Sequence, residues 1–455
     1  MKENQYFKQY EFECRCGKCQ LPPNVPSDEL ITILTEIREH FGQCLRINSG
    51  YRCPEHNARV GGAKSSQHCF SQDTKILTQN GWKTYESIDL ANDKVYSLNL
   101  QTNKIELVEI EDFFCYPIQN KPMFSFSNRY NDILVTDKHR VLYKKQKDAR
   151  RKNIDIWNIE EANNINLTRF RLFQGALKDG YTPNFIEFKY IMLCVAIICD
   201  GHIRKSGVVT FRLKKERKIN RIKTLLKELN LTYNEFTCKD NYIRLDLNVK
   251  SSKYFFNKLT PDKLIPMEWL EFSSETLRKI ILEYCFFDGC YDTGYDYEIL
   301  TSTNKRNIDL LHIMVCFSGW TGYLKAVSPK KYNIKGKIGI SKKYYTLSIT
   351  KKDSSVIRDY TPNISLYNGI VWCVSNKNTT LITKRNNKIS IQGNCVGSAA
   401  DFIVFKVPTE VVYQYVIEKY GDRPLGIAIK RNPNNPYGGF VHLDTRGKKA
   451  RWEYP

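Results

Sequence analysis

Two stretches near opposite ends of the chain read as halves of one short motif. Residues 66–68 spell Ser-Gln-His, and residues 395–401 spell Cys-Val-Gly-Ser-Ala-Ala-Asp. Joined directly, they give Ser-x-His-x-x-Gly-x-Ala-x-Asp, a pattern that residues 69–394 interrupt. A motif that is complete only without its middle constrains the fold strongly. Residues 1–68 and 395–455 should build one unit, and the interrupting segment should fold separately.

The joined motif resembles the metal-binding motif of zinc D-alanyl-D-alanine carboxypeptidases and related peptidoglycan peptidases. Two further strings resemble the same family: Ser-Gly-Tyr-Arg-Cys-Pro at residues 49–54 and Gly-Phe-Val-His-Leu-Asp at residues 439–444. The resemblance implies a zinc ion held by His68, Asp401 and His442. Such a set leaves one position open for water, as catalytic zinc requires.

That resemblance also implies roles for two other residues. Arg52 stands where the family has an arginine that binds substrate or stabilises developing negative charge, which suits a planar guanidinium. A surface ion pair is the alternative for Arg52. Some relatives place a general base, a glutamate, three residues before the last histidine, but Gly439 stands there. Asp444 therefore either accepts the proton or orients His442.

The interrupting segment resembles an intein, a self-splicing element with the horseshoe-shaped Hint fold. It begins with Cys-Phe-Ser-Gln-Asp-Thr at residue 69, contains Thr-Asp-Lys-His at residues 136–139, and ends with Gly-Asn before Cys395. Runs typical of β-strands at residues 94–99 and 132–142 agree with a fold made mostly of strands.

The resemblance implies a splicing role for several of these residues. Cys69 supplies the thiol for an N–S acyl shift. His139 protonates the scissile amide, and Thr136 polarises it. Cys395 then takes the acyl chain, and Asn394 cyclises through its own side-chain amide to release the segment. Splicing of this kind needs no cofactor.

Two positions depart from the intein pattern. Many inteins carry histidine immediately before the terminal asparagine, whereas this chain has Gly393. An upstream histidine of the same segment is absent, with Asn378-Thr379 near its place. Cys373 stands where relatives carry aspartate or cysteine, which makes it a candidate to assist. We therefore expect cyclisation of Asn394 to be slow or to use other hydrogen-bond donors.

Two apolar stretches inside the segment resemble the helices of LAGLIDADG homing endonucleases. They end at Asp200 and Asp288, each followed by glycine. In that family two such helices pack at a pseudo-twofold interface, and each terminal acid holds Mg²⁺ beside a scissile phosphate. The basic run at residues 212–218 fits a strand that contacts DNA. The second stretch is degenerate, and a shifted register would put Cys290 at the acidic position; ordinary buried helices are the other alternative.

Most of the net charge lies in the interrupting segment. The chain carries 70 Lys and Arg against 48 Asp and Glu, a net charge of +22, and residues 69–394 hold 52 and 34 of them. Such a basic excess favours a phosphate backbone as partner, although the lysine-rich habit of an AT-rich genome would also produce it. The expected partners are double-stranded DNA and a peptidoglycan peptide, with Mg²⁺ and Zn²⁺ as cofactors. We expect a monomer.

Three sequence features bear on localisation. Residues 1–13 are polar and charged, unlike a signal peptide. The longest apolar run, residues 191–199, is shorter than the ~20 residues needed to cross a bilayer. The 15 cysteines without an export signal indicate reduced thiols, ligands or nucleophiles. We expect a cytoplasmic protein of phage or bacterial origin, without membrane association, whose joined product acts at the cell wall.

The expected fold class is multidomain α+β. A small α+β zinc peptidase is split by an all-β Hint horseshoe, which itself carries an α/β LAGLIDADG endonuclease with two pseudo-symmetric αββαββ halves. The predicted parts are residues 1–68, 69–168, 169–357, 358–394 and 395–455. The alternatives are a splicing element with an inactive endonuclease in a zinc-binding, non-catalytic host, or an inert insertion.

Overall fold

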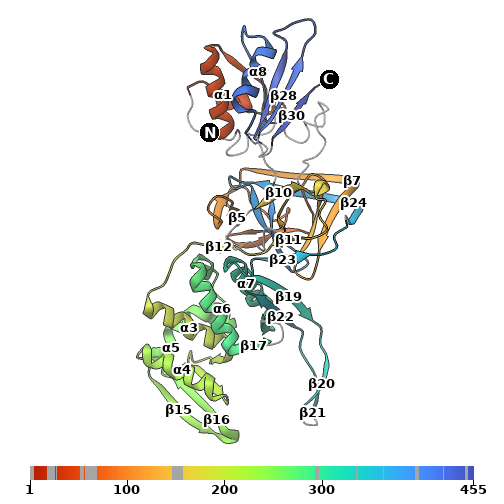
Figure 1. The fold of residues 1–455 in the computed structure, drawn as a ribbon. Coiled ribbons are helices and arrows are strands. Elements are labelled where there is room, and N and C mark those ends of the chain that lie inside the picture. The colour runs from red at the N-terminus through yellow and green to blue at the C-terminus, as the bar shows by residue number, and fades with distance from the viewer. Residues whose placement is uncertain are drawn as a thin grey trace.

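Three bodies follow one another in the structure, which is a computed structural model (Figure 1). Both ends of the described chain lie in the upper body, the middle body consists of strands, and the lower body combines helices with strands. Among the described residues, no helix has the length and apolar character to cross a membrane. The described residues are 5–17, 26, 28–51, 56, 69–145, 157–292, 297–334, 337–361, 363–394, 399–423, 425–445 and 449–454.

Segments from the two ends of the chain pair in one sheet of the upper body. Its strands are β1 (Leu45–Ser49), β27 (Ala399–Val404), β28 (Gly426–Arg431), β29 (Gly439–Asp444) and β30 (Ala450–Glu453), and its helices are η1 (Gln9–Phe12), α1 (Asp28–Phe41) and α8 (Thr409–Tyr420). The sheet order is β1-β27-β29-β28-β30. β1 lies antiparallel to β27, with Leu45 opposite Val404 and Ile47 opposite Phe402. The two distant segments therefore share one hydrophobic core.

Helix α1 shows why this core forms. Asp28 and Glu29 occupy the first turn, where the helix dipole favours negative charge. Gly42 follows the last residue with φ of 58°, a left-handed conformation that glycine adopts without strain. The apolar face of the helix is buried: Leu30, Ile31, Ile33, Leu34 and Ile37. The amphipathic pattern therefore becomes one wall of the core.

The middle body is built from strands. They are β2 (Phe70–Ser71), β3 (Lys75–Thr78), β4 (Gly81–Lys83), β5 (Lys94–Asn99), β6 (Lys104–Glu109), β7 (Asp112–Ser127), β8 (Asp132–Thr136), β9 (Arg140–Lys145), β10 (Asn158–Glu161), β11 (Phe170–Phe173), β12 (Leu177–Lys178), β23 (Ser354–Ile357), β24 (Asn363–Ser375), β25 (Thr380–Arg385) and β26 (Lys388–Gly393), with the short helix η3 (Ala162–Asn164). β2, β24, β7 and β8 close into a small barrel. The other strands form the sheets β12-β6-β5-β3-β25-β26, with β4 beside β3, and β10-β9-β11-β23.

The sequence pattern indicated one continuous strand over residues 132–142, but the structure divides this stretch in two. β8 ends at Thr136 and β9 begins at Arg140. A tight turn separates them, because the N–H of His139 donates to the carbonyl oxygen of Thr136 at 3.0 Å. The turn thus carries both the threonine and the histidine that were singled out from the sequence.

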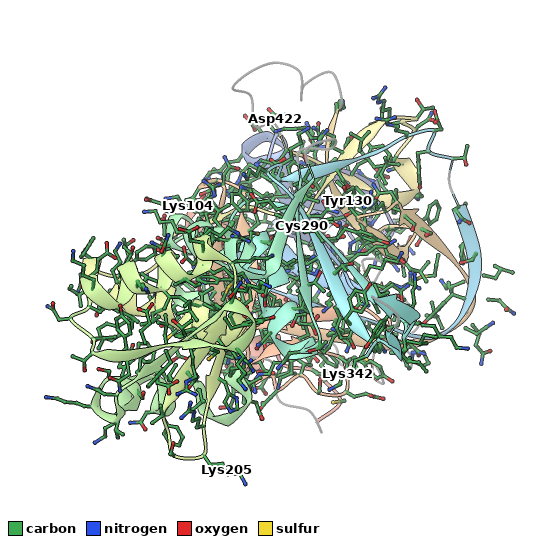
Figure 2. The ribbon with its side chains drawn as sticks, turned by 90° about the horizontal axis from the view of Figure 1, so that it is seen from below. Lys104, Tyr130, Lys205, Cys290, Lys342 and Asp422 are labelled. Carbon is green, nitrogen blue, oxygen red and sulfur yellow. The ribbon has the colours of Figure 1, made fainter. Side chains whose placement is uncertain are left out.

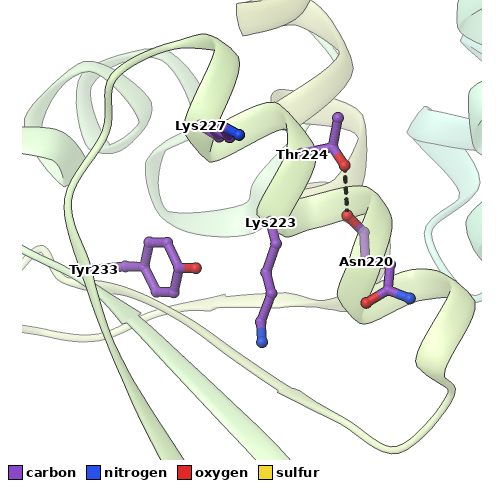
Figure 3. Close-up of a pocket in the computed structure, with 5 residues that line it drawn as sticks. All are labelled: Asn220, Lys223, Thr224, Lys227 and Tyr233. Atoms are coloured by element: carbon purple, nitrogen blue, oxygen red, sulfur yellow. Dashed lines mark hydrogen bonds between the residues drawn. The ribbon is translucent and has the colours of Figure 1, made fainter.

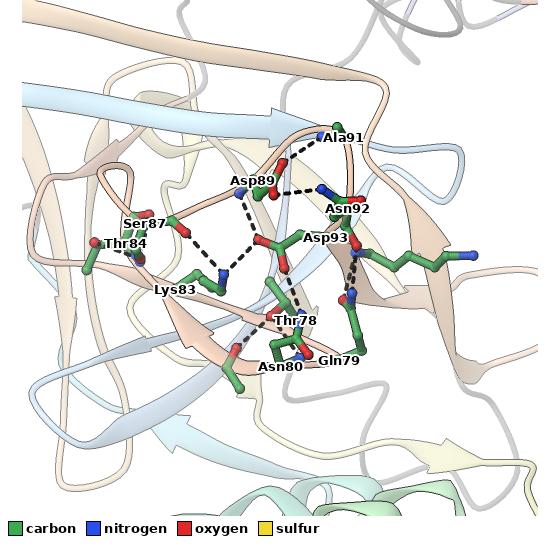
Figure 4. Close-up of polar contacts among 12 residues, drawn as sticks. Thr78, Gln79, Asn80, Lys83, Thr84, Ser87, Asp89, Ala91, Asn92 and Asp93 are labelled. Atoms are coloured by element: carbon green, nitrogen blue, oxygen red, sulfur yellow. Dashed lines mark hydrogen bonds and ion pairs between the residues drawn. The ribbon is translucent and has the colours of Figure 1, made fainter.

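A buried carboxylate organises the loop between β4 and β5 (Figure 4). Asp93 is only 2% exposed. It accepts hydrogen bonds from the N–H of Asp89 at 2.8 Å and from Asn80 Nδ2 at 3.2 Å, and Lys83 Nζ lies 3.1 Å away. A buried charge with several partners is tolerated, because these groups replace the water that it loses. This loop is therefore held in one arrangement.

The lower body repeats one order of elements twice. The first copy comprises α3 (Phe185–Asp200), β13 (Gly201–Ile203), β14 (Val209–Leu213), α4 (Glu216–Glu228), β15 (Tyr233–Cys238), η4 (Lys239–Asn241) and β16 (Tyr242–Leu247), followed by α5 (Val249–Lys263) and η5 (Met267–Glu271). The second comprises α6 (Ser274–Asp288), β17 (Gly289–Asp292), β18 (Tyr297–Ser302), α7 (Lys305–Phe317), β19 (Thr321–Val327), the hairpin strands β20 (Lys331–Ile334) and β21 (Lys337–Ile340), and β22 (Tyr344–Thr350). The sheets are β13-β14-β16-β15 and β17-β18-β22-β19. The first copy has the expected αββαββ order, and the second has the same order with the hairpin β20-β21 inserted between its last two sheet strands.

Helix α3 lies at the centre of this repeat. The side chain of Asn184 caps it by accepting the N–H of Glu187 at 3.0 Å, as N-cap residues do. Its apolar run, residues 191–198, is buried on every side of the helix, so the helix has no solvent-facing stripe there. It packs against α6, which makes these two helices the common core of both copies.

The middle and lower bodies share an interface. The ring of Tyr96 from β5 lies 4.8 Å from that of Phe317 in α7. Lys384 from β25 is 8% exposed and forms an ion pair of 2.7 Å with Asp309 of α7. One cluster of buried hydrophobic residues continues across the boundary. The two bodies are therefore packed together as well as connected by the chain.

Candidate functional site

Asp200 and Asp288 come together at the ends of two packed helices. Each is the last residue of its helix, α3 or α6, and each precedes a glycine whose N–H closes the final turn. The ammonium of Lys218 lies 2.5 Å from Asp200 Oδ2 and 4.0 Å from Asp288 Oδ1. Both carboxylates therefore face one small space. Cys290, the alternative acidic position, is exposed in β17.

Burial and the neighbouring carboxylate disfavour ionisation of the acidic groups in this space. Burial raises the pKa of Asp288, and the charge of Asp200 raises it further, whereas Lys218 opposes the shift. The thiol of Cys199 contacts Asp288, and burial, followed by the two carboxylates, raises the pKa of that thiol well above its usual range. The acid pair therefore requires a cation beside it.

Lys218 differs from the other residues of its basic run. The sequence suggested one strand over residues 212–218, but the structure does not contain it. β14 ends at Leu213, and α4 begins at Glu216. The side chains of Arg212, Lys214, Lys215 and Arg217 are exposed. Lys218 is only 7% exposed and turns inward to the acids. Its role was not visible from the sequence, because a lysine in a basic run carries no signal of burial.

Some other lysines of the lower body face solvent. Figure 2 shows the side chains from below, with Lys205 before β14 and Lys342 before β22 among those labelled. Lys205 and Lys342 are both exposed. The two copies thus each present basic side chains outward near strand ends.

Cys69 and Thr136 contact each other in the middle body. Cys69 is fully buried, and its N–H donates to Thr136 Oγ1 at 3.0 Å. The N–H of Thr136 in turn donates to the carbonyl oxygen of Cys69 at 3.1 Å. His139 follows in the same turn, and its ring lies 4.5 Å from the ring of Phe70. The structure thus brings together three of the predicted splicing residues.

Gly393 approaches the same turn from the other end of the segment. A Cβ at position 393 would come within 2.5 Å of the carbonyl oxygen and 2.7 Å of the Cβ of Arg140, which directly follows His139. Real Cβ atoms do not reach such distances, so no side chain fits here without movement of the backbone. Position 393, where the intein pattern predicts histidine, therefore accommodates glycine for a steric reason.

Asn394 is fully buried beside this contact. Its N–H donates to the carbonyl oxygen of Thr379 at 3.1 Å. Through Gly393 and Arg140, this end of the segment lies close to the turn that contacts Cys69. Residues that are far apart in sequence are thus neighbours in the middle body.

Cys373 occupies the neighbouring strand of the barrel. It is fully buried in β24, where its Sγ lies 3.3 Å from the carbonyl oxygen of Val374. The preceding residue, Trp372, stands opposite Phe70 of β2 in register. The structure therefore places Cys373 on the strand beside the one that follows Cys69.

Asp401, His442 and Asp444 form a polar chain across the upper sheet. Asp401 and His442 are directly opposite each other on β27 and β29. His442 Nδ1 lies 2.7 Å from Asp401 Oδ1, and His442 Nε2 lies 2.9 Å from Asp444 Oδ2. Burial alone lowers the pKa of His442, but the hydrogen bonds to the two carboxylates outweigh it and raise that pKa. Two predicted metal ligands are therefore adjacent.

The distance between Asp401 and His442 is shorter than a zinc site requires. Two ligands at about 2.0–2.2 Å from a tetrahedral ion lie roughly 3.4 Å apart, which exceeds the observed 2.7 Å between Asp401 and His442. Asp444 already contacts the other imidazole nitrogen, as the outer carboxylate of a histidine ligand does. Within the described ranges, no group of three or more His, Cys, Asp or Glu side chains is arranged to hold a metal. The third predicted ligand, His68, lies outside those ranges.

Two further predicted residues also fall outside the described part of the chain. They are Arg52 and Cys395. Their assigned roles remain predictions from the sequence.

Arg385 is a second basic side chain that sequence reasoning missed. It lies at the end of β25 and forms ion pairs with Asp73, at 2.8 Å, and with Asp132. Asp73 follows the strand after Cys69, and Asp132 begins the strand that ends at Thr136. No local pattern predicts these two ion pairs, because Arg385, Asp73 and Asp132 lie far apart in the sequence.

A surface hollow of about 530 Å³ lies between α4 and β15 (Figure 3). It is lined by Asn220, Lys223, Thr224, Lys227 and Tyr233. Lys223 pairs with Glu235 at 2.7 Å, and the hydroxyl of Thr224 donates to the carbonyl oxygen of Asn220 at 2.9 Å. Lys223 and Thr224 therefore already have partners within the protein, and we assign no ligand to the hollow.

The first part of the chain matches a known family of peptidases. Residues 5–90 match the family described as Peptidase M15. The match includes α1 and β1 and continues into β2, β3 and β4, which belong to sheets of the middle body.

One curated protein is similar over a longer stretch. Ribonucleoside-diphosphate reductase subunit beta of Aquifex aeolicus (strain VF5) is 20% identical over 374 residues, which cover 72% of this chain and 50% of that protein. The chain therefore spans about half the length of this relative.

Solved structures are similar to part of the chain. I-DmoI in complex with DNA and Mn is 18% identical, with a TM-score of 0.25, and the match covers 36% of this chain and 90% of that one. The N-terminal LAGLIDADG domain of DUF199/WhiA is 13% identical, with a TM-score of 0.24, and the match covers 36% and 78%. The chain thus matches Peptidase M15 in its first residues, and the two structural matches each cover about a third of its length.

Proposed function

We propose that residues 69–394 excise themselves and join residue 68 to residue 395. One observation carries this proposal: the two ends of the segment converge on the turn at residues 136–140, while the flanking segments pair in a sheet of their own. Excision that leaves the flanking sheet intact requires the two ends of the segment to lie close together.

The first step is an acyl shift at Cys69. Its Sγ attacks the carbonyl carbon of the preceding residue, the C–N bond breaks, and the Cys69 amine takes up a proton. The hydrogen bond from the Cys69 N–H to Thr136 Oγ1 orients the nitrogen that leaves. His139, in the same turn, is the proton donor for that nitrogen.

The later steps release the segment and restore a peptide bond. The Cys395 thiol attacks the thioester and takes the acyl chain, which frees the Cys69 thiol. The side-chain nitrogen of Asn394 then attacks its own carbonyl carbon, and the bond to Cys395 breaks. The new Cys395 amine finally attacks the thioester, and an amide and a thiol result. Burial of Asn394 supports cyclisation, because it excludes the water that would compete.

The masses of the expressed products test the splicing proposal. We expect a species of residues 69–394 and a second species in which residues 1–68 are joined to 395–455. Cys69→Ala should leave the chain whole, and Asn394→Ala should block release of the segment from the downstream part. A full-length chain that persists regardless of Cys69 would instead indicate an inert insertion.

We also propose that the lower body cleaves double-stranded DNA with Mg²⁺. The carrying observation is the convergence of Asp200 and Asp288, since paired carboxylates are the ligands that Mg²⁺ prefers. The exposed basic side chains near the strand ends support contact with phosphates. When bound, the ion would activate water and stabilise charge on the phosphate. DNA carrying the rejoined, uninterrupted gene sequence should be cut in both strands, and Asp200→Asn should abolish cutting; intact DNA would indicate an inactive endonuclease.

For the joined product we propose a zinc peptidase that acts on peptidoglycan peptides. Asp401 and His442 would hold the ion together with His68, and the ion would polarise the peptide carbonyl and activate water. The contact of Asp444 with His442 favours an orienting role for this acid over that of general base. Release of peptides from purified peptidoglycan by the zinc-loaded product tests the proposal. Zinc binding without any hydrolysis would favour the non-catalytic alternative.

A further inference from the structure

The ammonium of Lys218 lies where a cation is needed between the two acids. It is 2.5 Å from Asp200 and 4.0 Å from Asp288, and the side chain is 9% exposed. We propose that Lys218 occupies the metal position in the DNA-free protein and that arriving DNA draws it away, so that DNA and divalent metal bind cooperatively. This inference rests on the proposed metal-dependent cleavage of DNA.

The local charges show why the lysine and the metal compete. Two carboxylates lie at the negative ends of two helices, so repulsion among them is strong unless a cation is present. Lys218 supplies that cation to both acids. Mg²⁺ needs carboxylate oxygens at about 2.0–2.1 Å and repels a neighbouring ammonium. The metal can therefore enter only after Lys218 has moved.

A second lysine near the acids, Lys263, is hydrogen-bonded to backbone carbonyl groups. Lys263 Nζ donates to the carbonyl oxygens of Ile198 at 3.0 Å and of Gly201 at 2.9 Å. These carbonyls belong to the last turn of α3 and the residue after it, so Lys263 satisfies groups that the helix end leaves open. Lys263 can stay in place when a metal binds. Lys218 is thus the cation that must exchange.

DNA offers the displaced ammonium a new partner. Lys214, Lys215 and Arg217 are exposed immediately before Lys218, and side chains of this kind bind phosphate. A phosphate held by them would lie within the region that the flexible four-carbon stem of Lys218 samples from the first turn of α4. The exchange of a carboxylate for a phosphate keeps the ammonium paired while it vacates the acids. Lys218 therefore links the two binding events.

Linkage gives the exchange a measurable size. If DNA increases metal affinity by some factor, metal must increase DNA affinity by the same factor. Couplings of this kind are typically about 5- to 150-fold. We expect a value in this range for the unmodified site and a value near 1 when position 218 carries no charge.

The test measures Ca²⁺ affinity by calorimetry in the full chain carrying Cys69→Ala, which keeps the chain intact. Titrations are made with and without a duplex of the rejoined gene sequence, and Ca²⁺ bound elsewhere is subtracted with an Asp200→Asn, Asp288→Asn chain. Lys218→Met, which keeps the length of the stem, should bind Ca²⁺ more tightly without DNA and should lose the gain from DNA. Lys223→Met, on the same helix but paired with Glu235, is the matched control and should retain that gain. Lys218→Arg keeps the charge and should also retain it.

The outcomes separate this inference from the proposed nuclease. Equal Ca²⁺ affinity with and without DNA, unchanged by Lys218→Met, would overturn the exchange while the metal site itself stands. A chain in which the Asp200→Asn, Asp288→Asn change removes no Ca²⁺ binding under any condition would overturn the metal site and, with it, the proposed nuclease. Amide hydrogen exchange of α3 and α6 reports that each variant is folded.

Discussion

Placing a histidine at position 393, as many inteins have, is expected to slow the proposed excision, although the intein pattern would suggest an improvement. The reason is steric. A Cβ at this position would lie 2.5 Å from the carbonyl oxygen and 2.7 Å from the Cβ of Arg140. The contact is with backbone as well as side chain, so it cannot be relieved by a rotamer change alone. Gly393→His therefore has to displace β26 or the turn that carries His139.

The magnitude follows from the overlap. Forcing extra groups into a packed site typically costs about 1–3 kcal/mol, and Gly393→Ala, which adds a single carbon, should fall in that range. Each 1.4 kcal/mol changes an equilibrium tenfold, so local opening of β25 and β26 should become roughly 5- to 150-fold more frequent. Gly393→His adds a whole imidazole and should exceed the alanine change.

Two measurements check this expectation in the full chain. Amide hydrogen exchange, made in a Cys69→Ala background, reports opening of β25 and β26. The fraction of chain converted to joined product, made with Cys69 present, reports excision. Lys377→His serves as the control, since this side chain is 67% exposed just before β25. Faster excision by Gly393→His, with unchanged hydrogen exchange, would refute the steric argument.

Three further predictions follow from contacts described above. Thr136→Val removes the acceptor for the Cys69 N–H while keeping the shape of the side chain. Thioester formation, measured by cleavage with added thiol, should slow by roughly tenfold, because such a hydrogen bond is worth about 1.5 kcal/mol. An unchanged rate would remove Thr136 from the mechanism. Asp444→Asn should weaken zinc binding by the joined product by about 10- to 100-fold in a chelator competition, as loss of an outer carboxylate does; full affinity with no hydrolysis would instead make Asp444 the general base. Lys384→Met leaves Asp309 with Lys305, which is 40% exposed, as its remaining ion-pair partner and should destabilise α7 by about 1–3 kcal/mol, read as faster hydrogen exchange there. Unchanged exchange would show that the pair does not hold the two bodies together.

Local patterns in the sequence predicted many of the elements. The strand β5 appears where the run at residues 94–99 placed it, because strand propensity acts over a few positions. The two repeats of the lower body were implied by the resemblance of two apolar stretches to LAGLIDADG helices. The stretch 132–142 was wrong as a single strand, because a turn hydrogen bond between residues 136 and 139 divides it.

Candidate residues were found more readily than their partners. Cys69, Thr136 and Asp200 could be named from motifs, since a motif keeps residue type and spacing together. Lys218 and Arg385 could not be named, because their meaning depends on residues brought beside them by packing. A basic side chain is ordinary on a surface and informative only when buried against acids.

The sequence by itself determined that one motif is interrupted, that the interrupting segment carries most of the positive charge, and which residues are candidates for chemistry. Only the tertiary structure decided that the flanking segments pair as β1 and β27, and that no side chain fits at Gly393. It also decided that Lys218 fills the space between two acids. The physical reason is range: propensity and spacing act between near neighbours, whereas steric exclusion and charge pairing act between any residues that the fold brings into contact.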